Sequence, residues 1–249
     1  MKIEKYVYFG KYPQKEIVNE FVINDLNLRG KDRFKKNGTE FIKIEDRWFY
    51  VEPIKWKVLE ENNGEALLVA NDILDISLFR EEDNNYKTSF IRNWLNKEFY
   101  NKAFNKEEKR KIIKFEVDNS AKSTNPYGHP KHFGKGKNKH ICENTFDKVS
   151  LLSLEEATNP NFGFKYPIMD FWADGSSYRP FKKDPTDYAI FRASKIDKEY
   201  LILSWWTRSP ESNGNYLVYC MTDGGISSYD ECVCNRETNG VVPIIKIKL

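Results

Sequence analysis

The chain has 249 residues, of which 40% are hydrophobic and 31% are charged, as in ordinary water-soluble globular proteins. This length allows one large domain or two small ones, with a sizeable buried core. Forty Lys and Arg residues against 37 Asp and Glu residues give a formal net charge of +3. Such a balance offers no electrostatic argument for nucleic acid or an anionic membrane as the main partner, so we expect neither.

The N-terminal residues MKIEKYVYFGKYPQ carry lysines but no apolar segment behind them, so they do not resemble a signal peptide. No run approaches the roughly 18 apolar residues of a membrane-spanning helix. The four cysteines lack the spacing of a disulfide framework, which indicates reduced thiols. These features predict a cytoplasmic protein without a membrane span, and they leave a surface or secreted location open.

The first half of the chain predicts mainly strands, in keeping with an aromatic fraction of 15%. Residues 6–14 predict a short strand that is closed by Gly10 and Pro13. Residues 15–46 are polar and irregular, and they predict either a loop or a hairpin that ends in residues 41–44.

The clearest hairpin signal lies just beyond. Residues 54–59 and 66–70 are rich in apolar and β-branched side chains, and Asn62-Asn63-Gly64 separates them. An Asn-Gly pair between two such runs favours a tight turn, so this segment predicts two antiparallel strands.

Helices are predicted in the middle of the chain. Beyond Thr88 or Ser89, either of which can cap an N-terminus, apolar residues follow at the spacing of one helical stripe: Ile91, Trp94, Leu95 and Phe99. Asn105, with Glu108 three residues later, predicts the start of a second helix.

The next segments alternate loops with short elements. Residues 118–145 are rich in Gly, Lys and Asn and predict a loop. Residues 147–154 predict a buried strand that runs into Ser153 and Glu156, which are spaced as a capping box for a short helix.

A last helix is predicted near residues 186–194, with Asp184 as its cap and Pro185 as its first residue. The C-terminal 50 residues contain three aromatic, β-branched runs separated by Asp223-Gly224-Gly225 and by residues 235–240, a strand–turn–strand–turn–strand pattern.

No repeat or linker divides the chain, so we predict a single domain over residues 1–249, with loop insertions near 15–46 and 118–145. Hairpins mixed with separate helices predict an α+β fold with a mainly antiparallel sheet.

Seven sequence blocks, in this order, carry a resemblance to a known family: FGKYPQ (9–14), PIKWKVLE (53–60), ALLVANDILD (66–75), SFIRNWLNKEFYNKAF (89–104), NTFDKVSLLSLEEATN (144–159), WWTRSP (205–210) and GVVPIIKIKL (240–249). Together they resemble a bacterial domain family of unknown function found in gut and oral Firmicutes. That family is related in fold to the C-type-lectin-like and sulfatase-modifying-factor group, which includes the formylglycine-generating enzymes.

The resemblance implies a C-type-lectin-like domain, with two main helices on a twisted antiparallel sheet and the N- and C-terminal strands paired. It places residues 6–9 beside residues 242–247. It implies no established activity, because the fold group includes both variable proteins that bind macromolecules and copper-dependent oxidases that convert cysteine to formylglycine. The chain departs from the group in longer loops at 15–46 and 124–143, and the cysteine context of the oxidase is absent.

The C-terminal strands and turns provide the main candidate for a ligand-binding surface. Aromatic planes combined with an arginine and amides are typical of recognition surfaces. The candidates are Trp205, Trp206, Arg208, Tyr216, Tyr219, Asp223, Tyr229 and Asn235. The alternative is ordinary packing, since strand alternation sends about half of such a set inward. Arg208 could equally pair with a carboxylate and hold its loop.

Two weaker hypotheses involve metals or thiols. His129, His132, His140 and Cys142 lie within one loop, and imidazole and thiolate are preferred zinc ligands. Their spacing fits no standard site and four lysines are interspersed, so an exposed polar loop is the alternative.

Cys220, Cys232 and Cys234 fall on two successive predicted strands, where they could form a redox pair or a copper(I) site. The alternative is buried cysteines that pack as small hydrophobic residues.

The sequence thus favours a non-catalytic, lectin-like binding module that recognises a glycan or a protein through its C-terminal strands and loops. We assign no catalytic residue and no cofactor. The alternatives are an oxidase-like enzyme that uses the cysteines and copper, and a structural domain without a ligand.

Overall fold

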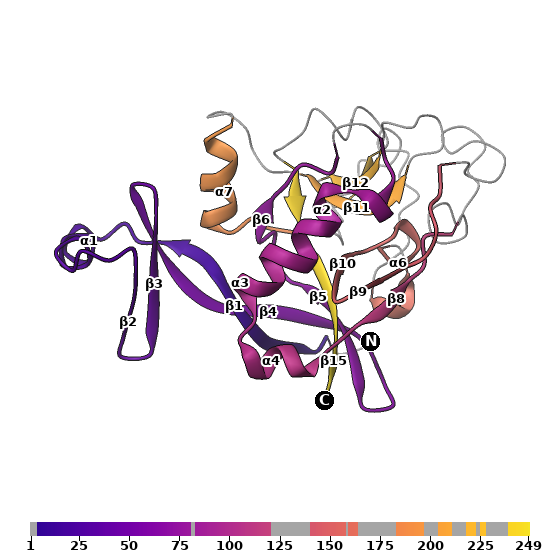
Figure 1. Cartoon of the computed structure of the whole chain (residues 1–249), viewed down its shortest axis with the longest axis horizontal. Coiled ribbons are helices and arrows are strands. Elements are labelled where there is room, and N and C mark those ends of the chain that lie inside the picture. Colours follow the sequence, from indigo (N-terminus) through magenta and orange to yellow (C-terminus); the bar gives the residue numbers. More distant parts are fainter. Residues whose placement is uncertain are drawn as a thin grey trace.

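The structure is a computed structural model that describes residues 4–80, 83–120, 140–157, 159–163, 183–196, 204–210, 218–222, 225–227 and 239–249, the segments 218–222 and 225–227 through their backbone alone. It is a mixed α+β arrangement with mainly antiparallel sheets, as the sequence predicts (Figure 1).

The largest sheet has the strand order β10-β15-β5-β4-β3-β2, with β1 also paired to β4 and β7 to β15. Its strands are β1 (Tyr6–Glu16), β2 (Arg33–Lys36), β3 (Thr39–Ile44), β4 (Arg47–Asn62), β5 (Glu65–Ala70), β7 (Ile112–Ile113), β10 (Val149–Leu151) and β15 (Pro243–Lys248).

A second sheet has the order β13-β12-β11-β14-β6, in which β11 and β14 are parallel and the other neighbours antiparallel. Its strands are β6 (Asp75–Ile76), β11 (Ser204–Pro210), β12 (Val218–Thr222), β13 (Gly225–Ser227) and β14 (Gly240–Val241). The strands β8 (Phe115–Val117) and β9 (Thr145–Asp147) form a separate antiparallel pair.

The helices are mostly short. They are α1 (Glu20–Asn27), η1 (Tyr86–Thr88), α2 (Phe90–Trp94), η2 (Leu95–Phe99), α3 (Tyr100–Ala103), α4 (Lys106–Lys111), α6 (Leu154–Ala157), η3 (Pro160–Phe162) and α7 (Asp187–Ser194). The segments α2, η2 and α3 follow one another without a break and form the longest helical run of the described residues, with a π-helical turn in its middle.

Several local predictions are confirmed. The β4–β5 hairpin turns at Asn63 and Gly64, whose φ angles of 51° and 76° are those of a type I′ turn. Ser89 caps α2 through a hydrogen bond from the backbone N–H of Arg92. Asn105 and Glu108 form the predicted capping box of α4.

Ser153 and Glu156 likewise cap α6. The Glu156 backbone N–H donates to Ser153 Oγ at 3.1 Å, and the Ser153 N–H donates to the Glu156 carboxylate at 2.8 Å.

The predicted pairing of the N- and C-terminal strands is wrong. Strand β1 pairs with β4, where Tyr6 faces Lys57 and Val7 faces Trp56. Both edges of β15 are already occupied, by β5 on one side and by β10 and β7 on the other. No edge of β15 is therefore left for the N-terminal strand.

Strand β1 also continues past Gly10 and Pro13 instead of ending there. Its pairing with β4 is irregular between Tyr8 and Lys11 and between Pro13 and Glu16, and it is regular again beyond each irregularity. At Gly10 φ is +69°, and an added Cβ would lie 2.6 Å from the ring of Phe104. Glycine is required at this position for two reasons. Other residues rarely adopt a left-handed φ, and a side chain would clash with the end of the helix behind it.

The start of α7 also differs from the prediction. Thr186, and not Asp184, caps α7, because the backbone of 184–186 bonds to Ile73 on both sides of Pro185 before the helix begins. Within the segment 15–46, the alternative of a hairpin that ends in residues 41–44 is confirmed by β2 and β3, and the helix α1 was not predicted.

The helix α1 and the β2–β3 hairpin project from the body of the molecule (Figure 1). This extension has a small hydrophobic cluster of its own, built on Ile17, Leu26, Phe41 and Trp48. The main core lies between the sheets and the α2–α3 helical run.

Candidate functional site

Three residues of the predicted C-terminal surface lie inside the protein. Trp205, Trp206 and Arg208 belong to β11 and are 1%, 0% and 1% exposed. The indole N–H of Trp206 donates to the carbonyl of Ser77 at 2.7 Å. These three side chains therefore pack in the core and are not part of an exposed surface. This is the alternative of ordinary packing that the sequence had left open.

The other five candidates are not placed by their side chains. Tyr216, Asp223, Tyr229 and Asn235 lie outside the described residues, and Tyr219 is described only as a backbone position of β12. A ligand surface on these five residues stays a prediction.

Arg208 follows its second predicted role, the pairing with a carboxylate. One guanidinium nitrogen lies 3.0 Å from a carboxylate oxygen of Glu156. The guanidinium also donates to the carbonyls of Leu151 at 2.6 Å and Asp118 at 3.1 Å. Arg208 thus joins β11 to α6 and to the end of the β8 segment.

The metal and thiol hypotheses also stay predictions. His129, His132, Cys232 and Cys234 lie outside the described residues, and Cys220 is described only in its backbone. Cys142 is half-buried, and burial raises the pKa of its thiol. Within the described ranges, no group of three or more His, Cys, Asp or Glu residues could hold a metal ion.

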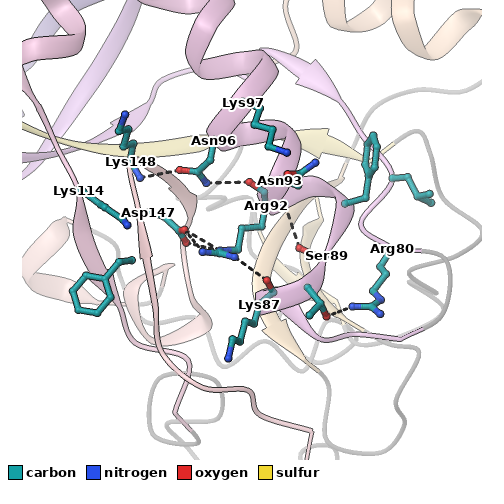
Figure 2. Close-up of a pocket in the computed structure, with 14 residues that line it drawn as sticks. Arg80, Lys87, Ser89, Arg92, Asn93, Asn96, Lys97, Lys114, Asp147 and Lys148 are labelled. Carbon is teal, nitrogen blue, oxygen red and sulfur yellow. Dashed lines mark hydrogen bonds and ion pairs between the residues drawn. The ribbon is translucent and has the colours of Figure 1, made fainter.

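A different site, which we call the basic groove, lies along the exposed side of α2 and η2 (Figure 2). It has a volume of about 930 Å³. Six basic residues and one acidic residue are among those that line it: Leu78, Arg80, Lys87, Thr88, Ser89, Phe90, Arg92, Asn93, Asn96, Lys97, Lys114, Phe146, Asp147 and Lys148.

The helix supplies one wall of the groove through its amphipathic pattern. Ile91, Leu95 and Phe99 are buried in the main core. Residues three and four apart share one side of a helix, so Arg92, Asn93, Asn96 and Lys97 all fall on the opposite side. They face the groove in Figure 2.

Asn96 joins this wall to the opposite one. Its side-chain N–H₂ group donates to the carbonyls of Arg92 at 3.0 Å and Val149 at 2.8 Å. Its oxygen accepts from the backbone N–H groups of Lys148 at 2.8 Å and Val149 at 3.2 Å. With all of these bonds made, Asn96 fixes the β9–β10 segment beside the helix.

Arg92 and Asp147 form an ion pair between the two walls. Arg92 Nε lies 2.9 Å and 3.0 Å from the two oxygens of Asp147, and a terminal nitrogen lies 2.6 Å from one of them. Asp147 is buried and also accepts from the hydroxyl of Thr145 at 2.8 Å. Burial alone would lower the pKa of Arg92, but the hydrogen bonds and charge of Asp147 raise it.

The orientation of Arg92 leaves part of its guanidinium unused. Its other terminal nitrogen donates to the carbonyl of Lys87 at 2.8 Å. These contacts occupy three of the five N–H bonds of an arginine. Two donors therefore remain on a side chain whose position is fixed by a buried carboxylate.

Three lysines around Arg92 have no carboxylate partner within the part of the chain that the structure describes. Lys97 and Lys114 are exposed. Lys148 is half-buried, with its ammonium 4.4 Å from the centre of the Tyr100 ring. They come from three separate segments, and they give the groove an excess of positive charge.

The remaining two cations belong to ion pairs at the rim. Lys87 pairs with the exposed Glu143, and this contact lowers the pKa of that carboxyl group. Arg80 lies 3.1 Å from Asp83 and also contacts the hydroxyl of Thr88.

Our sequence interpretation missed this groove. One signal was present: residues 87–97 contain Lys87, Arg92 and Lys97 but no acidic residue. The partner wall could not be found in this way, because Asp147 lies 55 residues beyond Arg92.

The structure therefore defines an α+β protein with mainly antiparallel sheets and a basic groove beside its longest helical run. A model of a domain of unknown function, DUF6273, matches residues 63–249, and the chain belongs to this family. The match includes every residue that lines the groove, whereas α1 and the β2–β3 hairpin precede it.

Comparison with curated proteins and with solved structures gave no match. Among the described residues, no helix is long and apolar enough to cross a membrane.

Proposed function

We propose that this protein is a non-catalytic binding module that takes an anionic ligand in the basic groove. The carrying observation is the placement of Lys97, Lys114 and Lys148 around Arg92, without a carboxylate partner in the described ranges. Like charges held together repel one another and do not stabilise the folded chain. A bound anion would remove this repulsion.

Arg92 supports the proposal through its geometry. A guanidinium presents its donors in a rigid fork that matches carboxylate, sulfate or phosphate oxygens. Asp147 and the carbonyl of Lys87 hold this fork in one orientation before any ligand arrives. A side chain that is already ordered loses less entropy on binding, so the affinity for a matching anion is higher.

The finer fold assignment belongs to the same proposal. A C-type-lectin-like domain, related to the formylglycine-generating enzymes, is supported by the mainly antiparallel sheet and by the α2–α3 run that packs in its core. Recognition of a glycan or a protein remains the general function that we propose. We assign this function to the basic groove, because Trp205, Trp206 and Arg208 are buried.

Calorimetric titration with a heparin-derived hexasaccharide, at low and at high salt, tests the proposal. We expect the triple variant Lys97→Gln, Lys114→Gln, Lys148→Gln to lose affinity by about tenfold or more, since each exposed ion pair contributes roughly 0.5–1 kcal/mol. Thermal unfolding should show that the variant remains folded.

The matched control removes three positive charges elsewhere. Lys31, Lys35 and Lys248 are exposed and lie outside the groove, so their replacement by Gln should leave the affinity nearly unchanged. Equal losses of affinity in both triple variants would show that binding depends only on the net charge of the protein. No binding by the unaltered protein would refute the proposed function.

A further inference from the structure

The basic groove is longer than a single anionic group. The nine residues from Ser89 to Lys97 span about 12 Å of helix, because they are separated by eight steps of about 1.5 Å each. All five of the cations other than Arg92 line the groove, and in Figure 2 Lys97, Lys114 and Lys148 lie toward one end of it, whereas Lys87 and Arg80 lie toward the other. Figure 2 shows Arg80 and Lys114 on opposite sides of Arg92. The two ends can therefore hold two separate anionic groups.

The two ends differ in how their cations are partnered. The lysines at the Lys97 end have no carboxylate partner in the described ranges, whereas Lys87 is paired with Glu143. Glu143 is exposed, and exposed ion pairs contribute little to stability. An anion on a bound ligand can therefore take the place of Glu143 at Lys87.

Two aromatic rings accompany the cations. Phe90 and Phe146 line the groove from opposite walls and are 49% and 56% exposed. Exposed phenylalanine rings offer flat apolar faces, which suit the C–H face of a sugar ring. The exposed Asn93 adds an amide that can bond to hydroxyl groups.

The combined chemistry selects among polyanions. A nucleic acid strand is disfavoured because 37 acidic residues nearly balance the 40 basic ones, so the net charge of the protein offers little long-range attraction for a polynucleotide. A peptide of Asp and Glu residues would satisfy the cations but would offer the two phenylalanine rings no ring with an apolar face. An acidic polysaccharide satisfies the cations, the amide and the rings together.

We infer that the basic groove binds an extended acidic polysaccharide, whose anionic groups reach both ends of the groove and displace Glu143 from Lys87. This inference rests on the proposed function and adds to it the class of ligand, its minimum length and a competing carboxylate. The cavity of about 930 Å³ lies at the upper end of the range for ligand pockets and provides the room for several sugar units.

The first experiment measures affinity against chain length. Heparin-derived di-, tetra-, hexa- and octasaccharides are titrated into the protein at one low salt concentration. We expect the affinity to rise by about tenfold or more from the shortest oligomer and then to level off once both ends of the groove are occupied, because the second contact is intramolecular. Equal affinity for the disaccharide and the hexasaccharide would overturn the inference and leave the proposed function intact.

The second experiment tests the competing carboxylate. Glu143→Gln should raise the affinity for the hexasaccharide about two- to fivefold, the value of one exposed ion pair, and should leave the affinity for the disaccharide unchanged. Glu61 provides the matched control, because it is an exposed carboxylate paired with Lys5 and lies outside the groove. An equal gain from Glu61→Gln would show that only net charge matters and would contradict the displacement of Glu143.

The third experiment tests the carbohydrate assignment. Phe146→Ser should weaken hexasaccharide binding about tenfold while leaving the binding of inorganic tripolyphosphate unchanged, since only a sugar ring uses the aromatic face. An unchanged hexasaccharide affinity, or an equally tight complex with hexaglutamate, would overturn the assignment to a polysaccharide. Failure of the oligosaccharides, of hexaglutamate and of tripolyphosphate to bind would instead refute the proposed function itself.

Discussion

Two arginine–carboxylate pairs in this protein use the same chemistry in opposite orientations. In the pair of Arg208 with Glu156, the arginine side chain is 0% exposed and the carboxylate side chain 26%. In the pair of Arg92 with Asp147, the carboxylate is 1% exposed and the arginine 27%. The first pair presents its acidic member to the surface, and the second presents its basic member.

This difference separates a structural arginine from one that is available to a ligand. Arg208 donates to two backbone carbonyls as well as to Glu156, so it holds three segments together from inside the core. Arg92 lines the groove, is held by Asp147, and keeps two N–H donors that no contact in the described ranges uses. Which member of the pair is exposed therefore decides whether its arginine can contact a ligand, since both pairs contain the same types of group.

The largest expected effect comes from removing the buried arginine. Arg208→Met should lower the free energy of unfolding by about 3–5 kcal/mol, because the carbonyls of Leu151 and Asp118 lose their buried donor and Glu156 loses its partner. Urea denaturation monitored by tryptophan fluorescence measures this loss. Retention of full stability would show that Arg208 does not hold these segments and would remove the contrast between the two pairs.

A half-buried lysine, Lys183, sharpens the comparison because no carboxylate of the described ranges is hydrogen-bonded to it. Lys183 Nζ donates to the carbonyl of Ala70 at 2.9 Å, and burial together with the nearby Lys57 lowers its pKa to about 8. The unfolded chain keeps this proton up to the ordinary lysine pKa of 10.5. Between these two values the unfolded state binds more protons, so stability rises with pH in this window.

We therefore expect the unaltered protein to gain about 2–3 kcal/mol over Lys183→Met between pH 7 and pH 10, since one pKa unit corresponds to about 1.4 kcal/mol. Urea denaturation of both proteins at the two pH values measures the difference, and ionisations common to both cancel. Parallel pH dependences would contradict a lowered pKa at Lys183. Neither arginine pair should produce such a pH dependence, because arginine stays charged throughout this range.

The elements that the sequence predicts well are those with local signals. The turn at Asn63-Gly64 and the caps at Ser89, Asn105 and Ser153 depend on residues within a few positions of one another. The β2–β3 hairpin had a similar signal in Asn37-Gly38, with φ angles of 51° and 82°, although our interpretation left a loop open there.

The features that the sequence did not predict depend on distant contacts. The partner of β1 is decided by which strand edges remain free, and this depends on the whole sheet. Trp205 and Trp206 resembled a recognition surface, but β11 lies within the second sheet and both side chains are buried. The groove depends on Arg92 and Asp147, which only the folded chain brings together.

The smallest expected effect is a change in ligand affinity on replacing Asp147. Its sign distinguishes a groove that attracts anions by charge alone from one in which Asp147 orients Arg92. Asp147→Asn removes a negative charge beside the site, so a purely electrostatic groove would bind the heparin hexasaccharide more tightly. If the carboxylate acts by orienting Arg92, the affinity should instead fall about threefold, because the guanidinium loses its fixed position. Arg92→Lys, which keeps the charge but not the fork, serves as the matched variant and should lower the affinity in the same direction. Calorimetry is carried out well below the unfolding temperature, so that the lower stability of Asp147→Asn does not affect the measured affinity. An increase in affinity would show that Asp147 stabilises the fold but does not assist binding.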